Sequence, residues 1–351
     1  MKKFLSIFLL TFLLVFSLCG CYTDIAETGA DSFPDFKIAL AVGEGGIEDD
    51  GFNSSAWEAL NEFRRQTGAI VECQIAEAPK YYYRNIELLA ESEKNYDVIW
   101  CMGYDMQEQA IEVAKKTPDK LFAIIDTDVT EGMPSNVICV NLAAEQSAFL
   151  SGYIAGNMTK TNALGFIKGR ECPSNDAFEY GFKAGAMYAG KELGKDVRVY
   201  TNCINTFFDQ SVASVATEEL ISRYDVDIVH QCAGSAGIGA ILKCQEKGIY
   251  AIGVDKDQSD VAPGTVITSS IKHVGSAIYS ISMRIAKGEL LGGTYQVLGM
   301  DTGHTGISTT SEQTVPEELM RKVNSISERI KSGALAIPSS EEQYSQFIGE
   351  L

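Results

Sequence analysis

Hydrophobic and polar positions alternate along this chain in two repeating patterns. Short apolar runs, typical of buried strands, are followed by segments in which apolar residues recur every three or four positions, as in amphipathic helices. The apolar runs predict strands at 36–42, 70–75, 96–101, 121–126, 137–140, 163–167, 197–201, 226–231, 250–254, 265–269, 294–299 and 306–309. The periodic segments predict helices at 55–66, 81–93, 106–116, 145–158, 175–193, 211–224, 238–247, 276–288 and 316–331.

Strands that alternate with helices indicate parallel sheets built from β-α-β units. Because two such series follow one another, we expect an α/β protein with two Rossmann-like lobes, each a parallel sheet flanked by helices. The late elements indicate that the chain crosses between the lobes more than once. The predicted division is a leader at 1–20, a tether at 21–35, an N-terminal lobe at 36–143 with about 256–290 returning to it, and a C-terminal lobe at 144–255 with about 291–351.

The N-terminus has the pattern of an export signal. Lys2 and Lys3 precede an apolar run at 4–18 that is short for a membrane-spanning helix. The run ends in Leu18-Cys19-Gly20-Cys21, which resembles a bacterial lipobox with Cys21 as the lipidated residue. An ordinary signal peptide with two incidental cysteines is the alternative. We therefore expect a lipid-anchored protein on the extracytoplasmic face of the cell membrane.

Composition narrows the classes of function. The formal charge of −18 argues against a folded part that binds nucleic acid or anionic membranes. None of the cysteines after Cys21 forms a C-x-x-C pair, and the three histidines are not at ligand spacing, so no metal site is expected. No G-x-S-x-G, P-loop or H-E-x-x-H motif is present, and we expect neither a cofactor nor an enzyme.

The stretch 49–58 joins the first predicted strand to the first predicted helix. In an open parallel sheet this is where ligands bind. Asn53 or Ser54 is suited to cap the helix and leave free N–H groups facing a crevice. Phe52 has no periodic partner, which favours a role as a ligand platform; the alternative is a hydrophobic staple that packs on its own helix.

Other polar, aromatic and glycine residues also follow predicted strands. If both sheets point their carboxyl ends at one cleft, these residues converge there and suit a small, neutral ligand with a planar part. For Asp126 and Asp255 a helix cap or Asx-turn is the alternative, and near Gly234 a tight strand-to-helix turn is favoured over a dinucleotide fingerprint. The residues are Phe52, Asn53, Tyr104, Asp126, Phe207, Phe208, Asp209, Gly234, Asp255 and Lys256.

Five segments, in order, resemble the basic membrane protein family of bacterial substrate-binding lipoproteins, whose best-understood members are purine nucleoside receptors. The resemblance runs from about 36 to 308. The segments are Asp50-Gly51-Phe52-Asn53-Ser54-Ser55-Ala56-Trp57-Glu58, Pro118-Asp119-Lys120-Leu121-Phe122-Ala123-Ile124-Ile125-Asp126, Phe178-Glu179-Tyr180-Gly181-Phe182-Lys183-Ala184-Gly185, Gly253-Val254-Asp255-Lys256-Asp257-Gln258 and Ile267-Thr268-Ser269-Ser270-Ile271-Lys272.

The resemblance implies a type I periplasmic-binding fold whose hinged lobes close on a purine nucleoside and deliver it to an ABC permease. It implies that Phe52 and Phe207, or Phe208 in its place, sandwich the base. Asn53 and Asp126 would read the edge of the base, and Asp255 and Lys272 would hold the ribose hydroxyls; Gly234 belongs to the same implied site. The chain departs from the family pattern at Tyr104, Lys168-Gly169-Arg170, Cys232-Ala233-Gly234 and Lys256.

Two alternatives remain open at the level of sequence. Lobes of this kind also bind pentoses, so a sugar or another small polar ligand is the alternative in the same class. A surface sensor lipoprotein without a permease is the alternative in a different class. An enzyme that uses the carboxylates for acid–base work on a glycoside comes last.

Overall fold

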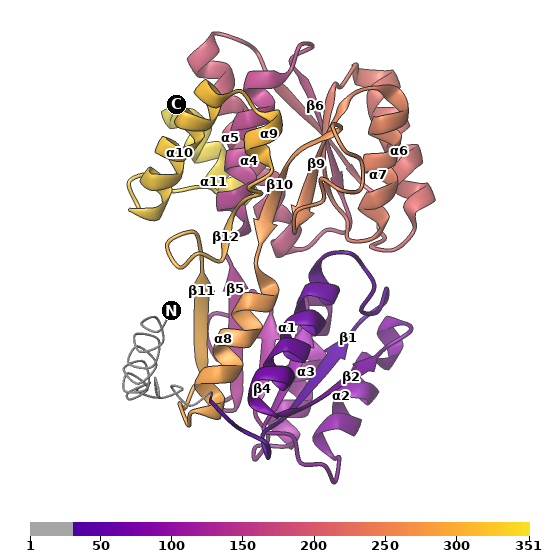
Figure 1. Cartoon of the computed structure of the whole chain (residues 1–351), viewed down its shortest axis with the longest axis vertical. Coiled ribbons are helices and arrows are strands. Elements are labelled where there is room, and N and C mark those ends of the chain that lie inside the picture. Colours follow the sequence, from indigo (N-terminus) through magenta and orange to yellow (C-terminus); the bar gives the residue numbers. More distant parts are fainter. Residues whose placement is uncertain (1–30) are drawn as a thin grey trace, which may run out of the picture.

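The computed structural model describes residues 31–351, and they form two α/β lobes stacked end to end (Figure 1). The predicted leader and Cys21 lie outside the described residues. The N lobe begins with β1 (Lys37–Val42), α1 (Phe52–Thr67), β2 (Ile70–Ile75), η1 (Pro79–Tyr81), α2 (Tyr82–Ala90), β3 (Val98–Met102), η2 (Tyr104–Met106), α3 (Gln107–Lys116), β4 (Phe122–Ile125) and β5 (Val137–Leu142).

The chain then enters the C lobe. This lobe contains α4 (Ala144–Met158), β6 (Ala163–Lys168), α5 (Pro173–Leu193), β7 (Arg198–Cys203), α6 (Gln210–Tyr224), β8 (Ile228–Cys232), α7 (Ala236–Lys247), β9 (Tyr250–Asp255) and β10 (Val266–Lys272). Two elements return to the N lobe, α8 (Val274–Ala286) and β11 (Thr294–Leu298). The C lobe is completed by β12 (Thr305–Ile307), α9 (Ser311–Thr314), α10 (Glu317–Lys331) and α11 (Glu341–Glu350).

Each lobe has a six-stranded sheet with a doubly wound strand order, and the parallel pairing that the alternating pattern predicted is present in both sheets. The order is β11-β5-β4-β3-β1-β2 in the N lobe and β12-β10-β9-β8-β6-β7 in the C lobe. All pairings are parallel except that of β12 with β10. The strands are largely buried because helices cover both faces of each sheet.

Apolar clusters fill the layers between helices and sheets. In the N lobe, α1 and α8 pack on one face around Leu60 and Trp100, and α2 and α3 pack on the other around Ile86. In the C lobe, α4, α5 and α10 cover one face, and α6 and α7 cover the other. Helices α4 and α5 cross with their backbones in contact, because a Cβ on Gly152 would lie 2.1 Å from the carbonyl oxygen of Phe182. Small residues are therefore required at this crossing.

The chain passes between the lobes three times, and the three passages lie side by side. They are at Ala143, at His273 and at 299–304. The backbone N–H of Ala143 donates to Leu298 O at 2.9 Å, and that of His273 donates to His304 O at 2.8 Å. Gln146 Oε1 also accepts from the Met300 N–H at 2.7 Å. These bonds tie the passages into one hinge along one side of the molecule.

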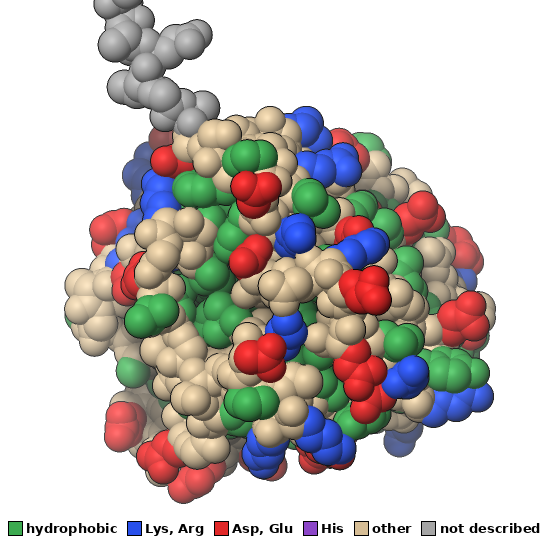
Figure 2. All heavy atoms as spheres, turned by 90° about the horizontal axis from the view of Figure 1, so that it is seen from below, with side chains coloured by type: hydrophobic (Ala, Val, Ile, Leu, Met, Phe, Trp, Pro, Cys, Tyr) green, Lys and Arg blue, Asp and Glu red, His purple; other side chains and the backbone are tan. Residues whose placement is uncertain are grey.

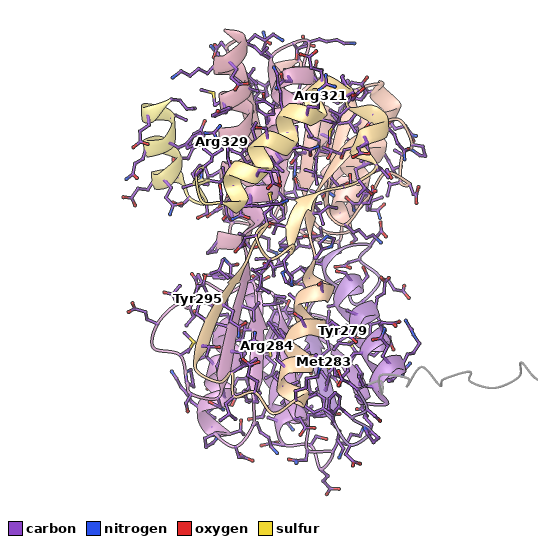
Figure 3. All side chains as sticks on the ribbon, turned by 60° about the vertical axis from the view of Figure 1, so that its left-hand side comes forward. Tyr279, Met283, Arg284, Tyr295, Arg321 and Arg329 are labelled. Carbon is purple, nitrogen blue, oxygen red and sulfur yellow. The ribbon has the colours of Figure 1, made fainter. Side chains whose placement is uncertain are left out.

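The returning segment differs from the expected one. We expected the chain to return to the N lobe at about 256–290, but β10 pairs with β9 in the C lobe, and β11 pairs with β5 in the N lobe. Figure 3 shows Tyr279 and Arg284 of α8 and Tyr295 of β11 in the lower lobe, and Arg321 and Arg329 of α10 on the upper lobe. The pattern of a strand does not specify which sheet it joins, so the sequence could not assign these strands.

The predicted elements are otherwise confirmed, with boundaries shifted by a few residues. The additional elements η1, η2, α9 and α11 were not predicted. Viewed from the far end of the N lobe, acidic and basic side chains are interspersed (Figure 2). Within residues 31–351, no helix combines the length and apolar character needed to cross a membrane.

Candidate functional site

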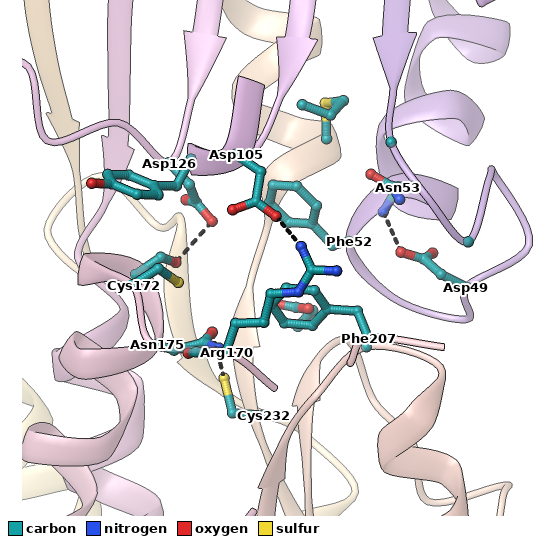
Figure 4. A pocket seen from close by; sticks show the side chains of 18 of the residues that line it. Asp49, Phe52, Asn53, Asp105, Asp126, Arg170, Cys172, Asn175, Phe207 and Cys232 are labelled. Carbon is teal, nitrogen blue, oxygen red and sulfur yellow. Dashed lines mark hydrogen bonds and ion pairs between the residues drawn. The ribbon is translucent and has the colours of Figure 1, made fainter. Parts of the chain in front are cut away.

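The carboxyl ends of the strands in both lobes face a cavity between the lobes (Figure 4). Its volume is about 130 Å³, whereas one water molecule needs only roughly 10–15 Å³. The cavity is therefore large enough for a small organic ligand. All seven residues that the sequence analysis assigned to the ligand site line it: Phe52, Asn53, Asp126, Phe207, Gly234, Asp255 and Lys272.

Asp49, not Asn53 or Ser54, caps helix α1. Its carboxylate accepts from the backbone N–H groups of Asn53 and Ser54 at 2.8 Å each, and from that of Gly51 at 3.2 Å. The expected free N–H groups facing the crevice are therefore already used. The Ser54 side chain also stabilises the helix start, because its Oγ accepts from the backbone N–H of Gly51 at 2.9 Å. The result is a fixed helix start that holds Phe52 and Asn53 at the cavity.

Two phenyl rings reach the cavity from opposite lobes. Phe52 is the first residue of α1, and its half-buried ring also packs against the N-lobe core. Phe207 lies in the loop between β7 and α6, where its carbonyl accepts from the Ala236 N–H at 3.0 Å. A Cβ on Gly169 would lie 2.3 Å from the Phe207 ring, so glycine is needed beneath this ring. Phe208 also lines the cavity, but its side chain is largely exposed.

Lys272 forms a buried charged cluster with Asp126 and Asp255. Its Nζ donates to Asp126 Oδ2 at 2.6 Å and lies 3.9 Å from Asp255 Oδ1. The Ser174 hydroxyl donates to the same Asp126 oxygen at 2.9 Å. The ammonium group also lies 4.8 Å from the centre of the Phe52 ring, which is a cation–π contact. The cluster thus joins the charged and the aromatic parts of the site.

Each aspartate has one buried oxygen, Oδ1 in both cases, that accepts no hydrogen bond from the described residues. Buried acceptors of this kind are costly unless a donor reaches them. Neither carboxylate accepts from a backbone N–H in the described part of the chain, so the helix-cap interpretation is wrong for both. Their backbones are left-handed, with φ of 60° at Asp126 and 65° at Asp255, which is uncommon outside glycine.

Burial and the neighbouring charges leave the pKa values of both Asp255 and Lys272 above their ordinary values. Burial raises the pKa of Asp255 to about 6; Lys272 opposes this effect, and Asp126 and Asp49 reinforce it. Burial lowers the pKa of Lys272, but Asp126 and Asp255 outweigh it and leave the pKa above its usual value. Lys272 is therefore charged at neutral pH, while Asp255 holds its proton more tightly than an exposed aspartate does.

Gly234 makes the turn from β8 to α7 and supports Phe207. Its φ is +54°, and a Cβ at this position would lie 3.0 Å from the Phe207 carbonyl oxygen. The interpretation of this segment as a tight strand-to-helix turn is confirmed. The lack of a side chain at Gly234 thus lets the backbone of this turn lie close to Phe207 in the cavity wall.

Several residues of the cavity wall were not assigned to the ligand site at the level of sequence. They include two carboxylates, one guanidinium group, a hydroxyl and a buried ring: Glu44, Asp105, Arg170, Ser174 and Phe178. Glu44, Asp105 and Arg170 each follow a strand closely, so the rule that located Asp126 and Asp255 could have found them. Within residues 31–351, no group of histidine, cysteine or acidic side chains is arranged to hold a metal ion, and the seven cysteines there are all free thiols.

The two lobes, the hinge and the cavity between them define a two-lobed solute-binding protein. The sequence matches, over residues 36–341, the family described as ABC transporter substrate-binding protein PnrA-like. The chain belongs to this family, which confirms the resemblance seen in the sequence. Its members are solute-binding proteins of ABC transporters, so a small-molecule ligand and a permease are the partners that membership implies.

Named relatives and solved structures agree. Basic membrane protein A of Borreliella burgdorferi is 33% identical over 90% of this chain and 91% of its own. The CD4+ T-cell-stimulating antigen of Listeria innocua is 29% identical over 92% of this chain and 94% of its own. A solute-binding protein of an ABC transporter system from Aeropyrum pernix superposes with a TM-score of 0.81 at 22% identity, over 90% of this chain and 97% of its own. A second such protein, from Conexibacter woesei, has a TM-score of 0.66 at 24% identity, over 87% of this chain and 99% of its own. The two solved structures support the fold alone.

Proposed function

We propose that this protein binds a purine nucleoside between its lobes for uptake by an ABC transporter. The observation that carries the proposal is the pair of rings, Phe52 and Phe207, which line one cavity from opposite lobes. A flat base between them would gain stacking contact on both faces when the lobes close. Closure of the lobes and recognition of the base would then occur together.

The polar groups fit the rest of a nucleoside. The unpaired oxygens of Asp126 and Asp255 need hydrogen-bond donors, and a nucleoside offers N–H groups on its base and hydroxyl groups on its ribose. Asn53 and Asp126 would read the base edge, while Asp255 and Lys272 would hold the ribose hydroxyls. An ionised carboxylate accepts from such donors, and an ammonium donates in return.

The N-terminus supports an anchored form of the protein. Lipidation of Cys21 would hold it at the extracytoplasmic face of the cell membrane, with 21–35 as the tether. The nucleoside would be released there to the membrane subunits of the permease. The binding protein itself would perform no chemistry on its ligand and would need no cofactor.

A thermal-shift panel tests the ligand class. Purine and pyrimidine nucleosides, free bases, pentoses and nucleotides are added separately to protein freed of bound ligand by unfolding and refolding. A ligand that binds only the folded state raises the unfolding midpoint by mass action. We expect the largest rise with purine nucleosides, confirmed by calorimetry. A rise with pentoses alone would favour a sugar receptor, and turnover of a bound nucleoside would restore the enzyme hypothesis. A permease gene beside this one would favour transport, and a neighbouring sensor kinase would favour a sensor role.

A further inference from the structure

Arg170 bridges the two lobes at the cavity wall. It follows β6 of the C lobe by two residues, and its guanidinium group donates to two carboxylates of the N lobe. The Nη1 atom lies 2.6 Å from Asp105 Oδ2, and the Nη2 atom lies 3.0 Å from Glu44 Oε1. Glu44 follows β1 and Asp105 lies in η2 after β3, so one side chain joins the ends of two N-lobe strands to the opposite lobe.

The base of Arg170 is fixed within the C lobe. Two residues earlier, the buried ammonium group of Lys168 lies 3.0 Å from Glu179 and also pairs with Glu171 and Asp176. Asn175, in the first turn of α5, donates from Nδ2 to the Arg170 carbonyl oxygen at 2.9 Å. The turn that carries Arg170 is therefore rigid, and its guanidinium group reaches the other lobe from a fixed point.

Arg170 also covers one of the two ligand-facing rings. Its guanidinium carbon lies 5.4 Å from the centre of the Phe207 ring, and Figure 4 shows Arg170 extending past Phe207 toward Asp105. The side chain is 26% exposed, so it lies where the cavity wall meets solvent. A ligand stacked on Phe207 could leave past this point only after the ion pairs had opened.

Two other ion pairs bridge the lobes: Lys272 with Asp126 belongs to the buried cluster of the site itself, and Lys256 with Asp50 is more open to water. The side chains of this last pair are 38% and 45% exposed, whereas Glu44 opposite Arg170 is 17% exposed. Exposed single pairs contribute little because water and salt screen them. A guanidinium group with two carboxylate partners makes stronger and more directional bonds. Arg170 is therefore better placed than Lys256 to govern opening.

We propose that Arg170 is the closing latch of the cleft, a positioning residue that sets how long the ligand stays bound. The proposal rests on ligand binding by lobe closure. When the lobes open, both ion pairs are lost. Without Arg170, Glu44 and Asp105 of the N lobe would also face Asp255, the cavity carboxylate of the C lobe, without their own counter-charge. Loss of Arg170 therefore favours the open form twice, by removing attraction and by leaving repulsion.

Dissociation kinetics test the latch. Release of a purine nucleoside is measured by stopped-flow in the whole protein and in Arg170→Ala, Arg170→Lys, Glu44→Gln and Asp105→Asn. We expect Arg170→Ala to release ligand at least about tenfold faster with little change in association rate, and Arg170→Lys to fall between it and the unchanged protein. Added salt should speed release from the unchanged protein more than from Arg170→Ala. In a double-mutant cycle, Glu44→Gln should add little once Arg170 is gone.

Arg321→Ala is the matched control. Arg321 pairs with Glu317 within α10, its side chain is 66% exposed, and Figure 3 shows it on the upper lobe away from the cavity. This variant should release ligand at the unchanged rate. If Arg170→Ala folds normally and also releases ligand at the unchanged rate, the latch is wrong, while the proposed ligand stands.

A ligand-independent measurement separates the two proposals. Spectroscopic labels are placed through non-natural amino acids at Leu88 on α2 and Val215 on α6, which are exposed residues of opposite lobes. The interlobe distance distribution is then compared between the unchanged protein and Arg170→Ala. We expect a larger open fraction in the variant. Equal distributions overturn the latch even if no nucleoside binds, and failure of every nucleoside to bind counts only against the proposed ligand.

Discussion

Lys272 and Asp126 are 146 residues apart in the sequence, yet Lys272 Nζ donates to Asp126 Oδ2 at 2.6 Å in the interior. The pair joins the end of β10 in the C lobe to the end of β4 in the N lobe. Burying two charges costs free energy unless their remaining polar atoms are also satisfied. Asp126 Oδ1 is not satisfied by any described residue. The pair therefore holds an acceptor ready for a ligand.

Replacement of Phe52 should separate binding from stability. In Phe52→Ala, loss of the stacked ring should weaken nucleoside binding roughly ten- to a hundredfold. The ring is half-buried and lines the cavity, so the ligand-free stability should fall by much less than the about 3–5 kcal/mol typical of a core Phe. Calorimetry measures the affinity, and denaturant titration measures the stability.

Leu60→Ala is the control for this comparison, because Leu60 lies on the same helix and is fully buried. It should cost about 2–5 kcal/mol of stability while the folded fraction binds normally. If Phe52→Ala behaves in the same way, Phe52 is a core staple and the platform belongs to other residues.

Nucleoside 5′-monophosphates should bind at least about tenfold more weakly than their nucleosides, about 1.4 kcal/mol. The cavity wall carries five carboxylates, Glu44, Asp49, Asp105, Asp126 and Asp255, against two cations, Arg170 and Lys272. Both cations already pair with carboxylates. Lys256, the other cation near the cleft, pairs with Asp50. Calorimetry with guanosine and its monophosphate provides the comparison, and equal affinities would show that one of these cations is recruited by phosphate.

Asp255→Asn should stabilise the ligand-free protein and weaken binding. The folded-state pKa of about 6 exceeds the ordinary value of 3.8, so the folded protein holds this proton more tightly than the unfolded chain. The stability contributed by Asp255 is present below about pH 4 and is lost as the pH rises through about 6. At pH 7, Asp255→Asn should therefore gain on the order of 1–3 kcal/mol, while losing the charged acceptor for the ligand.

The control is Asp225→Asn, which changes an exposed aspartate with nearly the same left-handed backbone, φ 57°. Any gain that comes from the backbone preference of asparagine appears in both variants. If Asp255→Asn gains no more stability than Asp225→Asn at pH 7, the buried charge of the Asp255 carboxylate does not destabilise the folded protein.

His230 should make the C lobe sensitive to acid. Its ring is fully buried, stacks on Phe166 at 5.1 Å, and meets Ser270 Oγ at 2.8 Å. Burial lowers its pKa from 6.5 to about 3. The unfolded chain therefore takes up the proton first, and stability falls as the pH drops from about 6.5 toward 3, by at most about 1.4 kcal/mol per pH unit.

Asp255 acts in the opposite sense between about pH 4 and 6, so the test uses the Asp255→Asn background. Denaturant titrations at several pH values compare this protein with a second one that also carries His230→Phe. The added substitution should flatten the acid slope. Identical slopes would mean that His230 is not the group that takes up the proton.

Cys21→Ser should release the protein from membranes or leave its precursor unprocessed. Cys21 lies outside the described residues, and the prediction depends on the lipobox-like sequence before it. Detergent-phase partitioning measures the effect, with Cys19→Ser as the control because that position is not the expected lipid acceptor. If Cys21→Ser still enters the detergent phase, the anchor hypothesis is wrong.

The sequence predicted the strands and most helices because their apolar periodicity is strong. It missed α11, in which no residue is fully buried, although Tyr344 and Phe347 pack against the C-lobe core. The strand-end rule located Asp126, which directly follows β4, Asp255, which is the last residue of β9, and Phe52, which follows the loop between β1 and α1. It could not assign β10 and β11 to their sheets, since the sequence of a strand does not specify which neighbouring strand it pairs with.

The interlobe contacts could not be predicted from the sequence for a different reason. Arg170 meets Glu44 and Asp105 only because two separately folded lobes face each other. No periodicity along the chain encodes which charge will lie opposite which. Similarly, Asp49 took the capping role expected of Asn53 or Ser54, because its side chain could reach three N–H groups at once. Local sequence rules thus predicted where polar residues lie near strand and helix ends, whereas the tertiary structure determines which groups they contact.

The threefold passage of the chain between the lobes limits how the protein can be taken apart. A fragment ending near residue 143 would lack α8 and β11. It would therefore expose the apolar residues around Leu60 that α8 covers, and the edge of β5 that pairs with β11. A chimera that exchanges lobes with a relative must therefore exchange several separate stretches of chain together. Circular permutation that opens the chain in the surface loop 287–293 would not make either lobe continuous. Recombination between relatives is accordingly expected to preserve whole receptors more readily than single lobes.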